Sequence, residues 1–178
     1  LDFIKYCLQP HGNFLNYVDT FGEFTLQNSE NLEDSNGRAI WALGFLISMK
    51  PILPQGLVEF AEAILKSACM NMRNMRSTRA IAFAIKGLYY SNLKNNSQQT
   101  IDLITELSNR LVQMFRHEAA KDWFWFESYL TYANSILPEA LLCAYLATGE
   151  RIYRDIAKVS FDFLLTKVFR DGSIKVIS

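Results

Sequence analysis

The sequence contains few of the residues that build metal and disulfide sites. Its 178 residues include two histidines, His11 and His117, and three cysteines, Cys7, Cys69 and Cys143, with no CxxC pair. Two distant histidines do not supply the clustered ligands of a transition-metal centre, so we expect no metal site. An odd and scattered set of cysteines is typical of free, buried thiols, which favours a reducing compartment and predicts a cytoplasmic location.

Net charge and long apolar runs are also absent. Eighteen Lys and Arg residues balance eighteen Asp and Glu residues, which predicts no nucleic-acid partner and no anionic membrane surface as partner. No apolar run reaches the roughly 18 residues of a membrane span. The first residues, LDFIKYCLQPHGN, lack the apolar core of a secretory signal.

The common nucleotide and hydrolase motifs are missing as well. No GxGxxG, P-loop, GxSxG or HExxH pattern occurs, so nucleotide binding, a serine triad and a zinc-protease site lose their usual support. We expect no cofactor.

Hydrophobic residues make up 50% of the sequence, and aromatic residues make up 13%. This composition predicts one folded domain, residues 1–178, with a sizeable core. Asp171-Gly172 is a turn signal, and Ser173 to Ile177 alternates like a strand. A strand with no partner after it suggests a piece of a longer protein.

Helical periodicity and capping residues predict six main helices. Ser97 caps one of them, Ser77 or Thr78 caps another, Asp34 to Asn36 precede the first, and Gly149 ends the fifth. The expected ranges are 37–50, 55–71, 79–93, 98–118, 138–148 and 151–169. Before them we expect a short helix over 1–8, an irregular β-hairpin over 13–25 and a polar loop over 27–36.

The six helices alternate in character. The first, third and fifth are apolar almost all round, whereas the others are amphipathic. A helix that is apolar on all sides is buried on all sides, so the pattern predicts an inner and an outer layer made of three successive αα-hairpins. A faint repeat supports this, because GRAIWA at Gly37 and TRAIAF at Thr78 share a frame that PEALL at Pro138 fits less well.

Three phrases carry a family resemblance: NLEDSNGRAIWALG, RSTRAIAFAIKGL and WFWFESYLTYANSILPEALLCAYLATGE. They resemble the six-hairpin, glycosidase-like (α/α)6 toroids of bacterial proteins, some of them associated with glycosyltransferases. The resemblance covers residues 31 to about 169 and implies an all-α partial toroid, about half of a complete one, with short β segments near both ends. It also implies a cup lined by the N-termini of inner helices. Such toroids host several activities, so the fold alone does not determine the reaction.

The aromatic run Trp123-Phe124-Trp125-Phe126 precedes the fifth helix. If this segment is extended, Trp123, Trp125 and Glu127 point one way, and both phenylalanines point the other way. In one interpretation the tryptophans face a sugar ring while the phenylalanines anchor the loop. In the other, all four rings belong to the core.

Four carboxylates near the expected cup are candidate catalytic residues. Glycoside hydrolysis needs two carboxyl groups at a defined separation, and the candidates are Glu33, Asp34, Glu127 and Glu139. Two of them have a simpler interpretation: Asp34 suits a helix cap, and Glu139, next to Pro138, suits the first turn of a helix. A ligand-contact role is a further alternative for Glu127 and Glu139.

Cations and polar groups complete the candidate cup. Arg38 and Arg79 begin inner helices, and Trp41 shares a helix face with Arg38. Arg73, Arg76 and Arg79 recur every three residues, which suits either an anion site for a sugar phosphate or uronate, or a buried ion pair at Arg79. Tyr132 and Asn134 are suited either to sugar hydroxyls or to the loop backbone.

These observations lead to two hypotheses of different classes. The first is a carbohydrate-active domain, glycosidase-like or glycosyltransferase-associated, that binds a sugar among the substrate-binding candidates Trp123, Trp125, Tyr132, Asn134, Arg38, Trp41 and Arg79. The second is a non-catalytic helical-repeat module for binding or structure. The missing half of the toroid or a second copy of the chain is the expected partner in addition to the carbohydrate.

Overall fold

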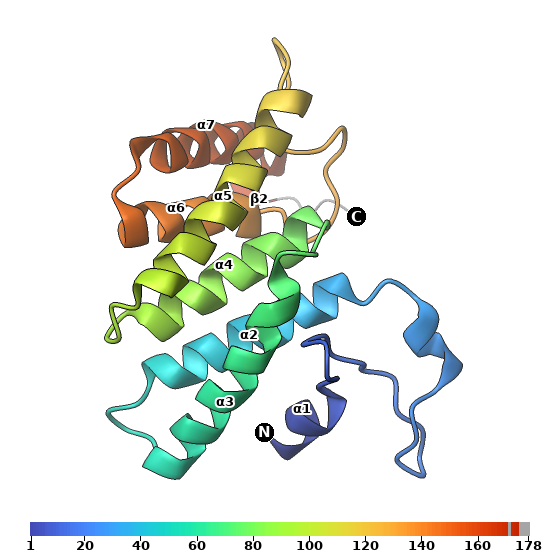
Figure 1. Cartoon of the computed structure of the whole chain (residues 1–178). Helices are drawn as coiled ribbons and strands as arrows, with labels where there is room; N and C mark the ends of the chain where they lie inside the picture. The colour runs from blue at the N-terminus through green and yellow to red at the C-terminus, as the bar shows by residue number, and fades with distance from the viewer. Residues whose placement is uncertain (171, 175–178) are drawn as a thin grey trace.

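The structure is a computed structural model that describes residues 1–170 and 172–174. Helices dominate this part of the chain, so the predicted all-α class is confirmed (Figure 1). The helices are α1 (Asp2–Cys7), α2 (Glu33–Ser48), α3 (Gln55–Met72), α4 (Thr78–Asn92), α5 (Gln98–Glu118), α6 (Ile136–Thr148) and α7 (Arg151–Val168). A 3-10 turn spans Leu26–Ser29, and two short strands, β1 (Phe169–Arg170) and β2 (Ser173–Ile174), pair in antiparallel fashion. No helix within these residues is both long enough and apolar enough to cross a membrane.

Helices α2, α4 and α6 lie side by side, with α4 in the middle (Figure 1). Each is followed by an antiparallel partner that packs against it: α3, α5 and α7, respectively. The predicted pairing into hairpins is therefore present. The N-terminal ends of α2, α4 and α6 all point to the same side, on the right of Figure 1. This arrangement brings the segments before these helices near one another.

Helix α4 is the centre of the core. Its residues 78 to 88 are all buried, and the other helices of the row cover it on both sides. It approaches α2 closely because glycines face each other: a Cβ added to Gly44 would lie 1.9 Å from the Gly87 carbonyl oxygen. Gly37 meets Ala80 in the same way, at 2.7 Å from the carbonyl oxygen. Small residues therefore set the distance between the first two helices of the row.

Most helices begin or end at the capping residues that the sequence predicted. The Ser77 hydroxyl accepts from the Ala80 N–H, the Ser97 hydroxyl accepts from the Thr100 N–H, and Gly149 ends α6 with a φ of 77°. The start of α2 differs, because this helix begins at Glu33 rather than at Gly37. Asp34 therefore lies in the first turn and is not the cap. The Asn31 side chain instead accepts from the Glu33 N–H at 2.9 Å.

Burial on all sides holds for α4 but not for the other two helices of the row. Phe45 on α2, together with Leu142 and Leu146 on α6, is exposed. The expectation was wrong for α2 and α6 because α4 has a neighbouring helix of the row on each side, whereas within residues 1–170 and 172–174 α2 and α6 each have one.

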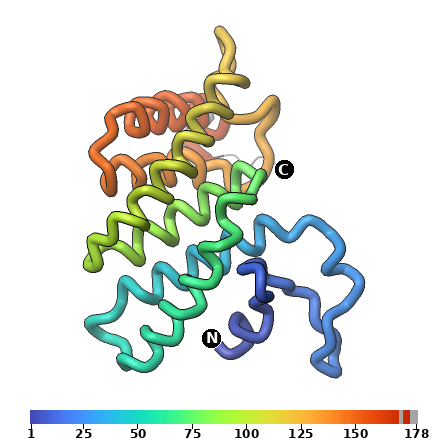
Figure 2. Tube along the Cα trace, viewed as in Figure 1, coloured from blue at the N-terminus to red at the C-terminus, as the bar shows by residue number. Residues whose placement is uncertain are grey.

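The irregular hairpin predicted over residues 13–25 is present in its second half, where the Thr25 N–H donates to the Tyr17 carbonyl at 3.1 Å and the Asp19 N–H donates to the Glu23 carbonyl at 2.9 Å. Isolated bridges join Leu8 to Phe14 and Val18 to Phe24, and the segment runs beside α2 and α3 (Figure 2). Asn36 holds it there, because its side chain accepts from the Phe14 N–H at 2.6 Å and donates to the Phe14 carbonyl at 2.9 Å. At the other end, β2 is the start of the strand predicted over 173–177, and its last three residues lie outside the described part of the chain.

Candidate functional site

Arg79 is the centre of a group of side chains at the N-terminal end of α4. We call Asp34, Arg38, Arg79, Glu127, Tyr132 and Asn134 the polar cluster. The Arg79 side chain is 6% exposed, and its Nη1 donates to both Glu127 carboxylate oxygens at 2.8 Å. Its Nε donates to the Tyr132 carbonyl at 2.7 Å, and its Nη2 donates to Asn134 Oδ1 at 3.1 Å. One buried guanidinium thus holds the loop before α6 against α4.

Glu127 and Asn134 are engaged by protein groups on several sides. The Thr78 hydroxyl also donates to Glu127 Oε1. Asn134 donates to the Thr131 carbonyl at 2.8 Å and accepts from the Thr131 N–H at 3.2 Å. Ala133, which lies between Thr131 and Asn134, has a φ of 48°. This left-handed conformation is energetically unfavourable for a residue that has a Cβ. These contacts favour the alternative in which Asn134 satisfies the loop backbone, with Glu127 as the partner of a buried ion.

The exposed part of the polar cluster is formed by Asp34, Arg38 and Tyr132. Arg38 Nε donates to the Asp34 carboxylate at 2.9 Å, and the Arg38 side chain is half exposed. The Tyr132 ring lies 5.0 Å from the Arg79 guanidinium carbon and 5.9 Å from that of Arg38. Partial burial and the Asp34 carboxylate raise the pKa of the Tyr132 hydroxyl, while Arg79 opposes this. Tyr132 therefore presents an exposed ring among charged groups.

A second group continues from the polar cluster across the row of helices. We call Arg38, Trp41, Phe45, Phe83, Lys86, Tyr90 and Glu139 the α2–α4–α6 face. The Arg38 guanidinium lies over Phe83, which stacks on Trp41 at 5.5 Å. Lys86 Nζ lies 4.2 Å from the Trp41 ring centroid and 2.7 Å from Glu139 Oε1.

This ion pair explains how α4 buries a lysine, because the charge keeps a carboxylate and an aromatic partner. It also explains why the Trp41 ring is not free to stack on a ligand: Phe83 and Lys86 already contact it. Phe45 at the far end is exposed and meets Tyr90 edge-on, with ring centroids 5.5 Å apart. The exposed rings of the two groups are therefore Tyr132 and Phe45.

The predicted orientation of the aromatic run is wrong. Trp125 is fully buried at 0% exposure against Phe126 and Phe163, and Phe124 is exposed. Trp123 is half-buried, packs on Phe163, and donates from Nε1 to the Glu127 carbonyl at 2.7 Å. The alternation failed because the segment bends repeatedly instead of running extended. Trp125 is thus a core residue, and the core alternative also holds for Phe126.

Glu33 and the other two arginines lie apart from the polar cluster's hydrogen bonds. Glu33 accepts from the Arg76 and Ser77 N–H groups at 2.7 and 2.6 Å, so it satisfies the backbone before α4. Arg73 pairs with Glu106 of α5 at 2.8 Å. Arg73 and Arg79 therefore pair with two different carboxylates, and the buried ion pair at Arg79 is the alternative that the geometry supports.

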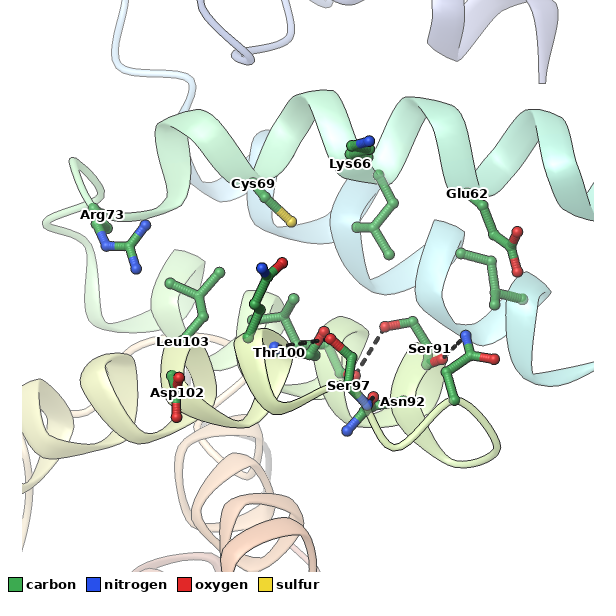
Figure 3. Close-up of a pocket in the computed structure, with 15 residues that line it drawn as sticks. Glu62, Lys66, Cys69, Arg73, Ser91, Asn92, Ser97, Thr100, Asp102 and Leu103 are labelled. Carbon is green, nitrogen blue, oxygen red and sulfur yellow. Dashed lines mark hydrogen bonds between the residues drawn. The ribbon is translucent and has the colours of Figure 1, made fainter.

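A cavity lies elsewhere, between α3 and α5 (Figure 3). It has a volume of about 660 Å³ and an apolar floor that includes Leu65, Leu88 and Leu103. Cys69 and Arg73 on α3 point into this space in Figure 3. Polar side chains of the turn before α5 close one end, where the Asn92 side chain accepts from the Ser97 N–H at 2.7 Å. Of the candidate residues, Arg73 lines this cavity, and the candidate carboxylates and aromatic residues do not.

Sequence reasoning missed Lys86, Phe83 and Thr78. A signal for Lys86 was present, because a single charge inside the apolar stretch AIAFAIKGL requires a buried partner. Phe83 and Thr78 carried no such signal, since a ring or hydroxyl in a buried helix is ordinary.

Comparisons with protein-family models, with curated proteins and with solved structures found no match. The chemistry of the site is therefore argued from its geometry. Glu127 and Glu139 each accept from a buried cation, Asp34 from Arg38, and Glu33 from backbone N–H groups. Each of the four candidate carboxylates is thus in contact with protein donors or cations, and the Glu139 side chain is still 47% exposed.

Proposed function

We propose that this protein is a non-catalytic carbohydrate-binding domain that uses the polar cluster and the adjoining α2–α4–α6 face. The observation that carries the proposal is the exposed Tyr132 ring beside the half-exposed Arg38–Asp34 pair. A sugar presents apolar C–H faces and many hydroxyls, so it suits an aromatic ring flanked by fixed donors and acceptors.

The surrounding contacts support pre-organisation of this surface. Arg79 donates to the Tyr132 backbone carbonyl and to the Asn134 side chain, on either side of Ala133, so the loop that carries the Tyr132 ring has a defined position before a ligand arrives. A surface that is already ordered loses less entropy on binding.

The proposal also includes a partial (α/α) toroid as the architecture of the domain. The row of α2, α4 and α6 with its antiparallel partners is the arrangement expected of part of an (α/α) toroid, and the shared side of the N-terminal ends suits the cup of such a fold. A glycosidase-like activity receives less support, because Glu33, Asp34 and Glu127 already accept hydrogen bonds from protein donors and Glu139 pairs with Lys86.

Glycan binding tests the proposal directly. We expect the parent protein to bind one class of glycan on an array, and Tyr132→Ala to weaken that binding about tenfold, as loss of a stacked ring does. Tyr129→Ala is the matched control, because Tyr129 is 62% exposed and Tyr132 is 52% exposed, and both belong to the same loop. Equal affinities of the two variants, or no glycan bound by the parent, would refute the proposal.

The second candidate is a helical module that binds other helices. It is favoured by exposed apolar side chains on the last hairpin: Leu142 and Leu146 on α6, and Phe161 and Leu165 on α7. Further helical hairpins or a second copy of the chain would cover them. Light scattering tests this, since Leu146→Asp is expected to abolish a concentration-dependent dimer of the parent. A parent that stays monomeric at all concentrations removes the second-copy form of this candidate.

A further inference from the structure

The charges of the proposed binding surface are matched one to one. The three cations of the polar cluster and the α2–α4–α6 face are Arg38, Arg79 and Lys86. They contact the carboxylates of Asp34, Glu127 and Glu139 at 2.9, 2.8 and 2.7 Å, respectively. No cation in these two groups is therefore left without a carboxylate.

One further charge of each sign lies just before α4. Arg76 is exposed just before α4, and Glu33 lies at the same place, where it accepts from the Arg76 N–H. Together, four positive and four negative side chains surround the N-terminal ends of α2 and α4 and the adjoining face. The surface thus has charged groups for hydrogen bonding but no excess charge of either sign.

This balance has a consequence for the ligand. An anionic group is bound tightly where cations are not neutralised by the protein, as in arginine clusters that recognise phosphate. Here an incoming carboxylate, sulfate or phosphate would meet a protein carboxylate beside every cation of the two groups. Like charges at close range oppose binding, and the buried Arg79 and Lys86 cannot exchange their partners without leaving a carboxylate unpaired.

We infer that the carbohydrate recognised by this surface is uncharged: a neutral glycan, and not a uronate, a sulfated sugar or a sugar phosphate. The inference rests on the proposed function. The half-exposed Arg38–Asp34 pair supplies a donor and an acceptor for hydroxyls, and the exposed Tyr132 and Phe45 rings provide apolar contact.

The experiment compares neutral oligosaccharides of glucose, mannose and galactose with oligomers of the corresponding uronic acids. We expect the parent protein to bind a neutral member at least about tenfold more tightly than its uronate counterpart. Affinity for the neutral ligand should change less than about twofold between low and high salt, because no net charge is neutralised. Tighter binding of the uronate overturns the inference and leaves the proposed function standing, whereas binding of neither kind refutes the proposed function itself.

A charge-unbalancing variant tests the cause. Asp34→Asn leaves Arg38 without its carboxylate and is expected to raise affinity for the uronate about threefold or more. The matched control is Asp155→Asn, which removes the same charge from the exposed Arg154–Asp155 pair on α7. If Asp34→Asn does not differ from Asp155→Asn in uronate affinity, charge matching at this surface does not set ligand charge and the inference fails.

Discussion

The Arg79–Glu127 ion pair allows a sharp test of whether Glu127 is structural. We consider Glu127→Gln, which keeps the shape and one acceptor but removes the negative charge. Arg79 and Glu127 side chains are 6% and 22% exposed, so the substitution leaves a guanidinium charge buried without its counter-ion. Removing one partner of a buried pair costs about 3–5 kcal/mol, and the retained amide oxygen reduces this to about 3 kcal/mol.

The chain contains a matched control in Glu106→Gln. Arg73 and Glu106 also pair at 2.8 Å, but their side chains are 59% and 42% exposed. Water and salt screen such a pair, so its loss costs about 1 kcal/mol or less. The two substitutions therefore make the same chemical change at the same distance, in a pair that is buried and also bonded to Thr78 and in a pair that is exposed.

Urea unfolding followed by far-ultraviolet circular dichroism measures both free energies. In thermal unfolding of a chain of this size, a loss of about 3 kcal/mol lowers the Tm by about 6–12 °C, whereas the loss expected for the control lowers it by at most about 4 °C. Equal destabilisation by the two variants would contradict the reasoning, because burial would then not determine the strength of the pair. A neutral effect of Glu127→Gln would show that Arg79 does not depend on its carboxylate.

Three further predictions follow from the packing, the backbone and the buried thiol. Gly44→Ala should destabilise the protein by about 3 kcal/mol or more in urea unfolding, because the added Cβ meets the Gly87 backbone. The control Gly56→Ala has open space around it and should stabilise the protein by about 0.5–1 kcal/mol. Similar effects of the two substitutions would contradict the close approach of α2 to α4. Ala133→Gly should stabilise by about 0.5–1 kcal/mol in the same assay because it relieves the positive φ, and a loss of stability would contradict this. Burial, with a smaller effect of Glu139, raises the pKa of Cys143 to about 11 from 9.0, so the free energy of unfolding should fall as pH rises from 9 toward 11. Cys143→Ala should reduce that fall by about 1–2 kcal/mol, and an unchanged pH profile would refute the assignment.

Several features of the fold could be predicted because their causes are local. Ser97 begins α5 and Gly149 ends α6 as expected, since a cap depends on residues within one turn. The apolar composition of α4 predicted its burial. The expected start of α2 failed by four residues because Asn31, earlier in the chain, supplies the side-chain acceptor.

The candidate site was predicted in part. Arg79 was expected to pair with a cup carboxylate, and the structure assigns Glu127 to it. The Lys86–Glu139 pair was not foreseen, because the two residues belong to different hairpins and only the packing of α4 against α6 brings them together. Trp125 was predicted to face a ligand but is buried, since the alternation that holds for extended chains does not apply to a bent loop.

The amino-acid sequence by itself determined the helices, most of their ends, and the division between apolar and amphipathic helices, because periodicity and capping act over a few neighbouring residues. Only the tertiary structure decided that Arg79 meets Glu127, that Lys86 meets Glu139, and which aromatic rings remain exposed. These depend on how closely the helices approach and on the path of the loop before α6, where contacts join residues 48 or more positions apart, as for Arg79 and Glu127. No local pattern contains that information.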